Sequence, residues 1–262
     1  MSMSAGSTPQ DGSTAMDWRA EELLVATIAD MLEGVRHVAV GASSPIPGAA
    51  ALLAQQRAGG RMRVSVLGSE RDNFFTDGAR ELFDCAAQGR IDAFFLGGGQ
   101  IDGAANINLV GIGAYPRSRV RFPGSFGSAY LYFLVPRVIL FRVEHSPRVL
   151  VPRVDFVSAP GTSPEHYYRP GGPYALVTGR CIFLFDKERR RFRLASVHPG
   201  HTLAEIREQT GFDFDSPEAV PQTAVPTRKT LDEIRHVIAT KIARTYPAFA
   251  AHLFDGVPGG TG

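Results

Sequence analysis

The chain has 262 residues, and its 28 Lys and Arg residues nearly balance its 26 Asp and Glu residues, for a formal net charge of +2. Because the two signs are interspersed, nucleic acid, whose binding needs a concentrated basic face, is not expected as a partner. With 44% hydrophobic and 21% charged residues, the composition is that of a globular protein and excludes disorder over most of the chain.

The cysteines and the termini give further limits. Neither Cys85 nor Cys181 lies in a metal-ligand spacing, so no disulfide framework and no structural zinc are expected. Residues 1–17 lack the basic start and apolar centre of a signal peptide, which predicts a disordered leader. The longest apolar stretch, 131–141, is interrupted by a Pro-Arg pair and falls short of the ~20 residues of a membrane helix. We therefore expect a cytoplasmic protein without a membrane segment.

The first half of the chain alternates helical and β-branched segments. The expected helices cover 18–32, 49–56 and 76–88, and the expected strands cover 35–40, 62–67 and 91–96. The strand segments are largely apolar rather than alternating, as in a parallel sheet that is covered on both faces. This half predicts an α/β fold.

The second half predicts shorter elements. The expected extended segments are 107–112, 120–122, 137–143, 149–158 and a hairpin over 181–197, with a short helix at 126–134 and a loop at 159–173. Capping boxes of Thr202 with Glu205, and of Thr230 with Glu233, predict the starts of two more helices. We expect one domain over residues 18–254, followed by a frayed tail at 255–262.

A glycine-rich segment, Gly97-Gly-Gly-Gln-Ile-Asp-Gly103, follows the expected strand at 91–96. Glycines after a buried strand let backbone N–H groups approach a ligand, as an oxyanion or thioester pocket requires. The segment is no dinucleotide fingerprint, because its third glycine is missing and no helix follows. A tight turn between strands explains the glycines equally well.

Glu70 comes shortly after the expected strand at 62–67. Ligands bind at the carboxyl ends of strands in an open α/β sheet, so a carboxylate there is placed for nucleophilic or acid–base work. A solvated glutamate, or one paired with Arg71, is the alternative.

Other polar motifs favour structural roles. His198 in His-Pro-Gly precedes a helix and is best explained as a residue that fixes a turn. Glu144 and His145 are adjacent, but consecutive strand residues point to opposite faces. The arginines at 189–191 fit a solvated hairpin tip, and Gly124-Ser-Phe-Gly-Ser128 does not match a serine nucleophile elbow.

Several motifs occur together in a fixed order. They are FFLGGGQIDGAANIN at 94–108, GIG at 111–113, PGS with a glycine at 123–127, VDF with SxPG at 154–161, HPG at 198–200 and TGF at 210–212. The combination resembles the β subunit of family I CoA-transferases, with the glutaconate branch closest, from about Glu21 to the last expected helix.

That resemblance implies an open, mostly parallel sheet with flanking helices and a partner α subunit, in an α2β2 or similar assembly. The substrates would be an acyl-CoA thioester and a carboxylic acid, with no metal and no prosthetic group. A β-subunit glutamate would attack the thioester, form a mixed anhydride and then carry CoA as a glutamyl thioester.

The resemblance implies roles for residues at or near the family's motifs. Glu70 is the candidate nucleophile. The candidates for oxyanion and CoA binding are Gly97, Gly98, Gly99, Gln100 and Asn106, and those for the substrate pocket are Ser43, Ser69, Ser125 and Gly127.

The sequence departs from the family at the nucleophile. Glutaconate-type subunits carry Glu-Ser-Gly or Glu-Asn-Gly at the strand end, whereas this chain has Leu67-Gly-Ser-Glu70. A glutamate displaced in this way resembles a branch of steroid ring-cleaving hydrolases that act on CoA thioesters. Three hypotheses remain open: a CoA-transferase subunit, a subunit of a CoA-thioester or C–C bond hydrolase, and a non-catalytic half that shapes its partner's site.

Overall fold

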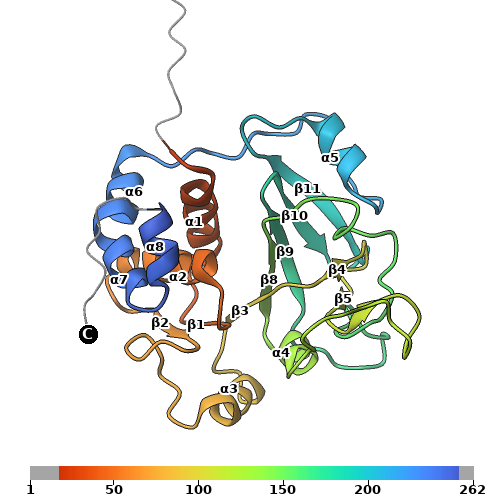
Figure 1. Cartoon of the computed structure of the whole chain (residues 1–262), viewed down its shortest axis with the longest axis horizontal. Coiled ribbons are helices and arrows are strands. Elements are labelled where there is room, and N and C mark those ends of the chain that lie inside the picture. Colours follow the sequence, from red (N-terminus) through yellow and green to blue (C-terminus); the bar gives the residue numbers. More distant parts are fainter. Residues whose placement is uncertain (1–17, 254–262) are drawn as a thin grey trace, which may run out of the picture.

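A seven-stranded sheet forms the centre of the protein, for which a computed structural model describes residues 18–253. Its strands are β1 (His37–Val40), β2 (Arg63–Val66), β3 (Ala93–Leu96), β8 (Arg137–Arg142), β9 (Pro173–Thr178), β10 (Cys181–Asp186) and β11 (Arg191–Val197). Their order across the sheet is β11-β10-β9-β8-β3-β1-β2 (Figure 1). The neighbouring strands β9, β8, β3, β1 and β2 are parallel to one another. Beyond β9, the strands β10 and β11 continue the sheet in antiparallel orientation. The expected open, mostly parallel sheet is confirmed.

Helices cover both faces of this sheet. One group comprises α1 (Ala20–Met31), α2 (Pro45–Arg57) and a C-terminal series of α6 (Arg228–Asp232), the π-helical turn η1 (Glu233–Ile238), α7 (Ala239–Ala243) and α8 (Pro247–Leu253). The C-terminal series lies beside α1 and α2 (Figure 1). The other group comprises α3 (Gly78–Ala87), α4 (Ser128–Leu134) and α5 (Leu203–Gln209). No helix within residues 18–253 is both long and apolar enough to span a bilayer.

Two apolar clusters hold these layers together, and the strands supply both by alternation. In β1, Val38 and Val40 join the cluster under α1 and α2, whereas Ala39 joins the cluster under α3 and α4. In β3, Phe95 points to the first cluster and Phe94 to the second. Successive side chains in a strand point to opposite faces, so a strand buried on both sides must be apolar throughout.

Successive strands are added on opposite sides of β1, so the strand order reverses there. After β1 the chain adds β2 on one side and then crosses back to place β3 on the other side of β1. The loops that leave β1 and β3 therefore diverge, which opens a crevice at the carboxyl ends of these two strands.

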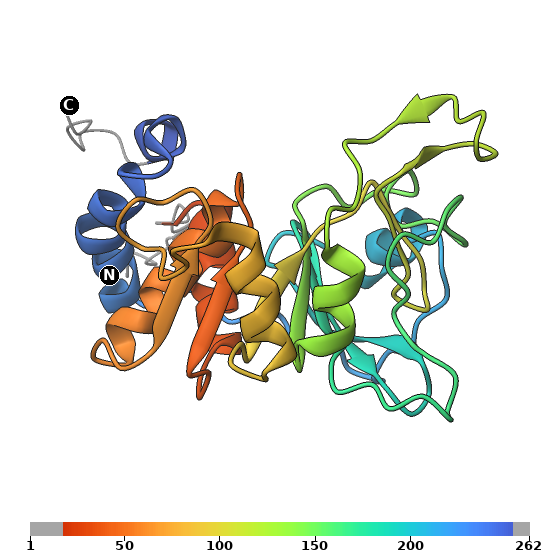
Figure 2. The ribbon, with the colours of Figure 1, turned by 90° about the horizontal axis from the view of Figure 1, so that it is seen from below.

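Two small antiparallel hairpins follow β3. In the first, β4 (Gln100–Ile101) pairs with β5 (Ile107–Asn108), and in the second, β6 (Gly111–Ile112) pairs with β7 (Val120–Arg121). Residues 110–122, here called the arm, stand out from the body of the protein as the yellow-green hairpin in Figure 2.

The structure corrects the sequence analysis at several places. The extended segment expected at 107–112 is divided between β5 and β6, which belong to two different hairpins, and the helix expected at 49–56 begins earlier, at Pro45. The strand expected at 149–158 is absent, and only Leu150 makes a bridge there, to Ile101. Pro152 lacks the N–H that a ladder needs. Conversely, β9 was not predicted. The expected leader at 1–17 and tail at 255–262 lie outside the described residues.

A further correction concerns the last helical segment, which begins at Arg228 rather than at the Thr230–Glu233 box. Thr227 is the capping residue, because its Oγ1 accepts from the Thr230 N–H at 3.2 Å. The box at Thr202 is confirmed, since its side chain accepts from the Glu205 N–H.

Tyr132 provides a test of packing in the second cluster. Its ring is fully buried, and its hydroxyl donates to the Ala105 carbonyl at 2.9 Å. Tyr132→Phe should lower the free energy of unfolding by ~1–2 kcal/mol, because the carbonyl loses its partner in a buried place. Urea unfolding measures this loss. The matched control is Tyr130→Phe, which removes a hydroxyl from a ring that is 46% exposed and should change stability by less than ~0.5 kcal/mol. Equal losses in the two variants would contradict the assignment.

Candidate active site

A cavity of about 600 Å³ lies at the carboxyl edge of the parallel strands. It sits at the crevice between β1 and β3, which is where open α/β sheets bind ligands. Three chain segments line it, one after each of β1, β3 and β8: Ser43, Ser44, Pro45, Ile46, Pro47, Phe95, Leu96, Gly97, Phe141, Arg142, Val143 and Glu144. The body of the cavity is apolar, and charged groups lie only at the end of β8.

Sequence analysis did not assign the β8 residues to the site. Glu144 accepts hydrogen bonds from Arg148 and from the Ser146 hydroxyl, each at 2.7 Å, and Arg142 lies 3.7 Å away. The Arg148 hydrogen bond, followed by that of Ser146, lowers the pKa of the Glu144 carboxyl. Glu144 is therefore a firmly paired carboxylate. Its position after a central parallel strand was the signal that could have identified it.

Ser43 and Gly97, two of the predicted site residues, lie on the cavity wall. Ser43 has a φ of +58°, in the left-handed region that non-glycine residues seldom adopt. This turn brings the chain from β1 into α2. A Cβ at Gly97 would lie 3.1 Å from the Phe141 carbonyl oxygen, so the loop after β3 passes close to β8.

The next two glycines are required by packing. A Cβ at Gly98 would lie 2.6 Å from Cγ2 of Ile107, and a Cβ at Gly99 would lie 2.3 Å from the Phe122 ring. The Gly99 amide donates to the Asn108 carbonyl at 2.9 Å. Within residues 18–253, no hydrogen bond uses the amides of Gly97 or Gly98. The Gly97 amide is therefore an available donor on the cavity wall, and the unpaired amide of the buried Gly98 follows it directly.

Gln100 and Asn106 are engaged within the chain and do not line the cavity. The Gln100 side-chain oxygen accepts from Asn108 Nδ2 at 2.7 Å and from the Asp155 N–H at 3.0 Å. Asn106 donates to Asp102 at 3.1 Å, and its side-chain oxygen accepts from the Gly161 N–H at 3.1 Å. Both side chains fasten the loops around the glycine segment.

Glu70 lies on the exit turn of β2 and is exposed. In the described part of the chain, no hydrogen bond or ion pair involves its side chain, and it does not line the cavity. The preceding Ser69 is buried, and its hydroxyl oxygen accepts from the Asp72 N–H at 3.1 Å and from Thr245 Oγ1 at 3.0 Å. Ser69 thus shapes the turn that presents Glu70. At the strand end itself the chain has the half-buried Leu67.

Ser125 and Gly127 also lie away from the cavity. The Ser125 carbonyl accepts from the Ser128 N–H at 2.8 Å at the start of α4. A Cβ at Gly127 would lie 2.2 Å from the Phe83 ring, so this glycine permits close contact between α3 and the loop before α4.

Two histidines considered in the sequence analysis, His145 and His198, do not line the cavity and form buried hydrogen bonds. His145 lies between the hydroxyls of Thr178 and Thr210, at 2.9 and 3.0 Å. His198 contacts the Thr223 hydroxyl at 2.8 Å through Nδ1, and its Nε2 donates to the Thr178 carbonyl at 3.0 Å. Burial lowers the pKa of each to about 4. Neutral rings held on both sides agree with the structural roles expected for them.

The cysteines are unpaired, and in residues 18–253 no group of three or more His, Cys, Asp or Glu side chains is arranged to hold a metal ion. Burial raises the pKa of the Cys181 thiol to about 12, so this group stays protonated and is a poor nucleophile.

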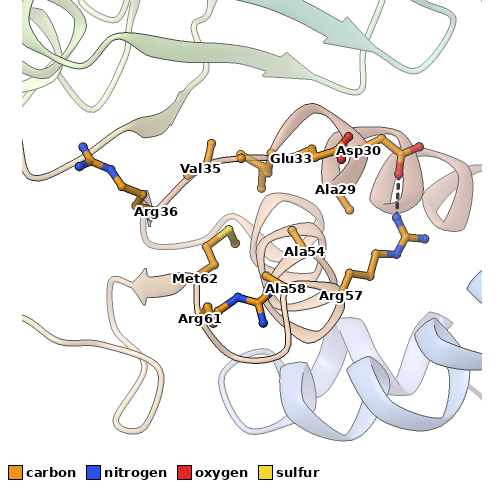
Figure 3. A pocket seen from close by; sticks show the side chains of 12 residues that line it. Ala29, Asp30, Glu33, Val35, Arg36, Ala54, Arg57, Ala58, Arg61 and Met62 are labelled. Carbon is orange, nitrogen blue, oxygen red and sulfur yellow. Dashed lines mark hydrogen bonds and ion pairs between the residues drawn. The ribbon is translucent and has the colours of Figure 1, made fainter.

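A second cavity, of about 580 Å³, lies at the opposite edge of the sheet, between the ends of α1 and α2 (Figure 3). At its rim, Arg57 Nη1 forms an ion pair with Asp30 Oδ1 at 2.7 Å. Arg61 and Arg36 lie on the other side of the cavity. None of the predicted site residues lies there. The carboxyl edge is therefore the candidate active site.

Comparison with known proteins shows the family of the chain. The family model described as coenzyme A transferase matches residues 21–209, which include the loops after β1, β2, β3 and β8. The chain belongs to the coenzyme A transferase family. The resemblance found in the sequence is thereby confirmed.

Individual relatives differ in their reactions. The B-type subunit of 3-oxoadipate CoA-transferase from Pseudomonas knackmussii is 34% identical over 59% of this chain and 62% of its own length. The cholesterol ring-cleaving hydrolase IpdB subunit of Mycobacterium tuberculosis is 30% identical over 62% of this chain and 66% of its own. This chain thus matches less than two thirds of either relative. The crystal structure of the decarboxylase AibA/AibB superposes with a TM-score of 0.74 at 25% identity, covering 91% of this chain and 99% of the other.

The buried histidines predict acid sensitivity. Unfolded histidines take up protons near the ordinary pKa of 6.5, whereas His145 and His198 resist protonation until about pH 4. The unfolded state therefore binds more protons in this window, and stability should fall as the pH drops from 6.5 to 4, by roughly 3 kcal/mol for each histidine.

Urea unfolding at several pH values measures this loss. His198→Gln should make the loss smaller by roughly 3 kcal/mol, because this histidine no longer contributes. The control is the exposed His166→Gln, which should retain the full loss. An unchanged pH dependence in His198→Gln would contradict this explanation.

Proposed function

We propose that this chain is the B-type subunit of a two-subunit enzyme that transfers CoA between acyl-CoA thioesters and carboxylic acids. Membership of the coenzyme A transferase family carries this proposal. The cavity at the carboxyl edge supports it, because an apolar pocket beside free backbone donors suits an acyl thioester.

Glu70 is the proposed nucleophile. Its carboxylate is exposed, has no protein partner in the described residues and stands on the turn after β2, beside the crevice strand β1. The carboxylate would attack the thioester carbonyl, expel the CoA thiolate and form a mixed anhydride. The thiolate would then attack the Glu70 acyl carbon, release the first acid and leave a glutamyl-CoA thioester for the acceptor acid. Each intermediate keeps the acyl group activated, which a transferase requires.

The amides of Gly97 and Gly98 are the proposed donors to the thioester oxygen. Both lack a partner within residues 18–253, and Gly97 lies on the cavity wall. Preorganised N–H groups stabilise the negative charge that develops on a carbonyl oxygen under attack. Gly99 is unsuited to this role, because its amide already donates to Asn108.

A partner subunit is part of the proposal. The 3-oxoadipate CoA-transferase relative is one subunit of its enzyme, and the superposed decarboxylase carries the two names AibA and AibB. An A-type subunit in an α2β2 or similar assembly would complete a site that is open in this chain, since Glu70 stands outside the cavity wall.

A second candidate is a hydrolase that cleaves a CoA thioester or a C–C bond of its acyl group. The observation that favours it is Leu67, an apolar side chain at the strand end, with Glu70 displaced along the turn. The similarity to a ring-cleaving hydrolase subunit supports this alternative. Turnover in water labelled with oxygen-18 separates the two reactions. Label in the product without any acceptor acid favours hydrolysis, whereas strict dependence on an acceptor excludes it.

The nucleophile is tested by Glu70→Gln in the assembled enzyme. We expect the transfer rate to fall by several orders of magnitude, because the amide cannot form the anhydride. Borohydride treatment after incubation with acyl-CoA should reduce the thioester and change the mass of the Glu70 peptide. The control is Glu188→Gln, an exposed glutamate in the turn between β10 and β11, which should keep full activity. Near-normal activity of Glu70→Gln would instead identify this chain as a non-catalytic half that shapes its partner's site.

A further inference from the structure

The arm at residues 110–122 carries an unbalanced positive charge. Between Gly103 and Val143 the chain has five arginines and no Asp or Glu, although its two signs nearly balance as a whole. Three of these arginines, Arg117, Arg119 and Arg121, lie on the arm, and all three are exposed. The charge is therefore concentrated on the part of the chain that projects from the body (Figure 2).

The base of the arm is attached to the glycine segment. The Phe122 ring packs directly on Gly99, where it leaves no room for a Cβ. The Gly113 amide donates to the Asp155 carboxylate at 2.8 Å, and Asp155 in turn accepts from Gln100. The arm is thereby held in a defined place relative to the Gly97 and Gly98 amides.

The three arginines differ in their surroundings. Arg121 donates to the Pro116 carbonyl at 3.0 Å and lies over the Tyr115 ring, 5.7 Å from its centre. The guanidinium groups of Arg117 and Arg119 have no hydrogen bond or ion pair within residues 18–253. The carboxylate at the base of the arm, Asp155, is occupied by an amide and by Gln100. Two cations thus remain without a counter-charge in the described part of the chain.

We propose that Arg117 and Arg119, backed by Arg121, bind the phosphate groups of CoA while its thioester lies at the glycine segment. This inference rests on the proposed function, which makes an acyl-CoA the substrate. Guanidinium groups present paired donors that match phosphate oxygens. CoA carries a diphosphate and a 3′-phosphate, and these are the anions that the substrate offers.

The spacing along the arm agrees with this assignment. Arg119 is three residues from Phe122, roughly 10 Å from the glycine segment at the rise of an extended strand, and Arg117 is farther out. In CoA, the extended pantetheine unit between the sulfur and the diphosphate is longer than this backbone distance, and the long arginine side chains add to the reach of the arm. A ligand with its sulfur at Gly97 and Gly98 would therefore bring its phosphates to the outer arm.

Equilibrium binding to the assembled two-subunit enzyme tests the proposal and needs no turnover. Calorimetry would give the Kd of CoA and of pantetheine, which has the same thiol end but no phosphates. Arg117→Gln/Arg119→Gln should weaken CoA binding at least tenfold, because charge-assisted hydrogen bonds are lost, and should leave pantetheine binding within twofold.

The matched control is Arg61→Gln/Arg90→Gln, which removes two exposed arginines from the opposite edge of the sheet. This control should bind CoA as the parent does. Unchanged CoA affinity in the arm variant would overturn the inference and leave the proposed function intact. Loss of the partner subunit from the purified arm variant would also overturn it, because the arm would then be a subunit contact. A parent enzyme that binds no CoA would refute the proposed function and this inference together.

Discussion

Close packing around Gly98 and Gly99 is the constraint on which the architecture of the carboxyl edge depends. Ile107 and the Phe122 ring occupy the space that Cβ atoms would need. The chain can therefore leave β3, double back through β4 and β5, and still pass beside β8. That path places the free amide of Gly97 at the cavity, with Gly98 next in the chain, and packs Phe122 at the base of the arm on Gly99. A side chain at either glycine would displace both features together.

Two glutamates at this edge have opposite surroundings. Glu144 is held by Arg148 and Ser146, which lower the pKa of its carboxyl and occupy its oxygens. Glu70 is exposed on a turn that the buried Ser69 shapes. A carboxylate whose oxygens already accept hydrogen bonds is a weak nucleophile. The reactivity of an unpaired carboxylate depends on whether it can reach the substrate. This contrast is the physical reason why we propose Glu70 as the nucleophile although it lies outside the cavity wall.

Local patterns predicted most elements of the first half correctly, because the strands there are buried on both faces and are therefore largely apolar. The strand predicted at 149–158 is absent because a strand needs a neighbouring strand to pair with, and an apolar composition does not show whether one is present. There, the backbone of Leu150 bridges a single residue of β4. The start of the last helical segment was misplaced because Thr227 and Thr230 both suit a capping position, and only the direction of the hydrogen bond distinguishes them.

The sequence by itself determined the α/β class, the glycine segment and the family, since these depend on residue types in a fixed order along the chain. Only the tertiary structure determined which of the candidate site residues lie close together. It placed Ser43 and Gly97 in one cavity with Arg142 and Glu144. Gln100, Asn106 and Ser69 form hydrogen bonds that stabilise loops. The reason is that a side chain's availability depends on partners far away in the sequence, such as Thr245 for Ser69. No local pattern contains that information.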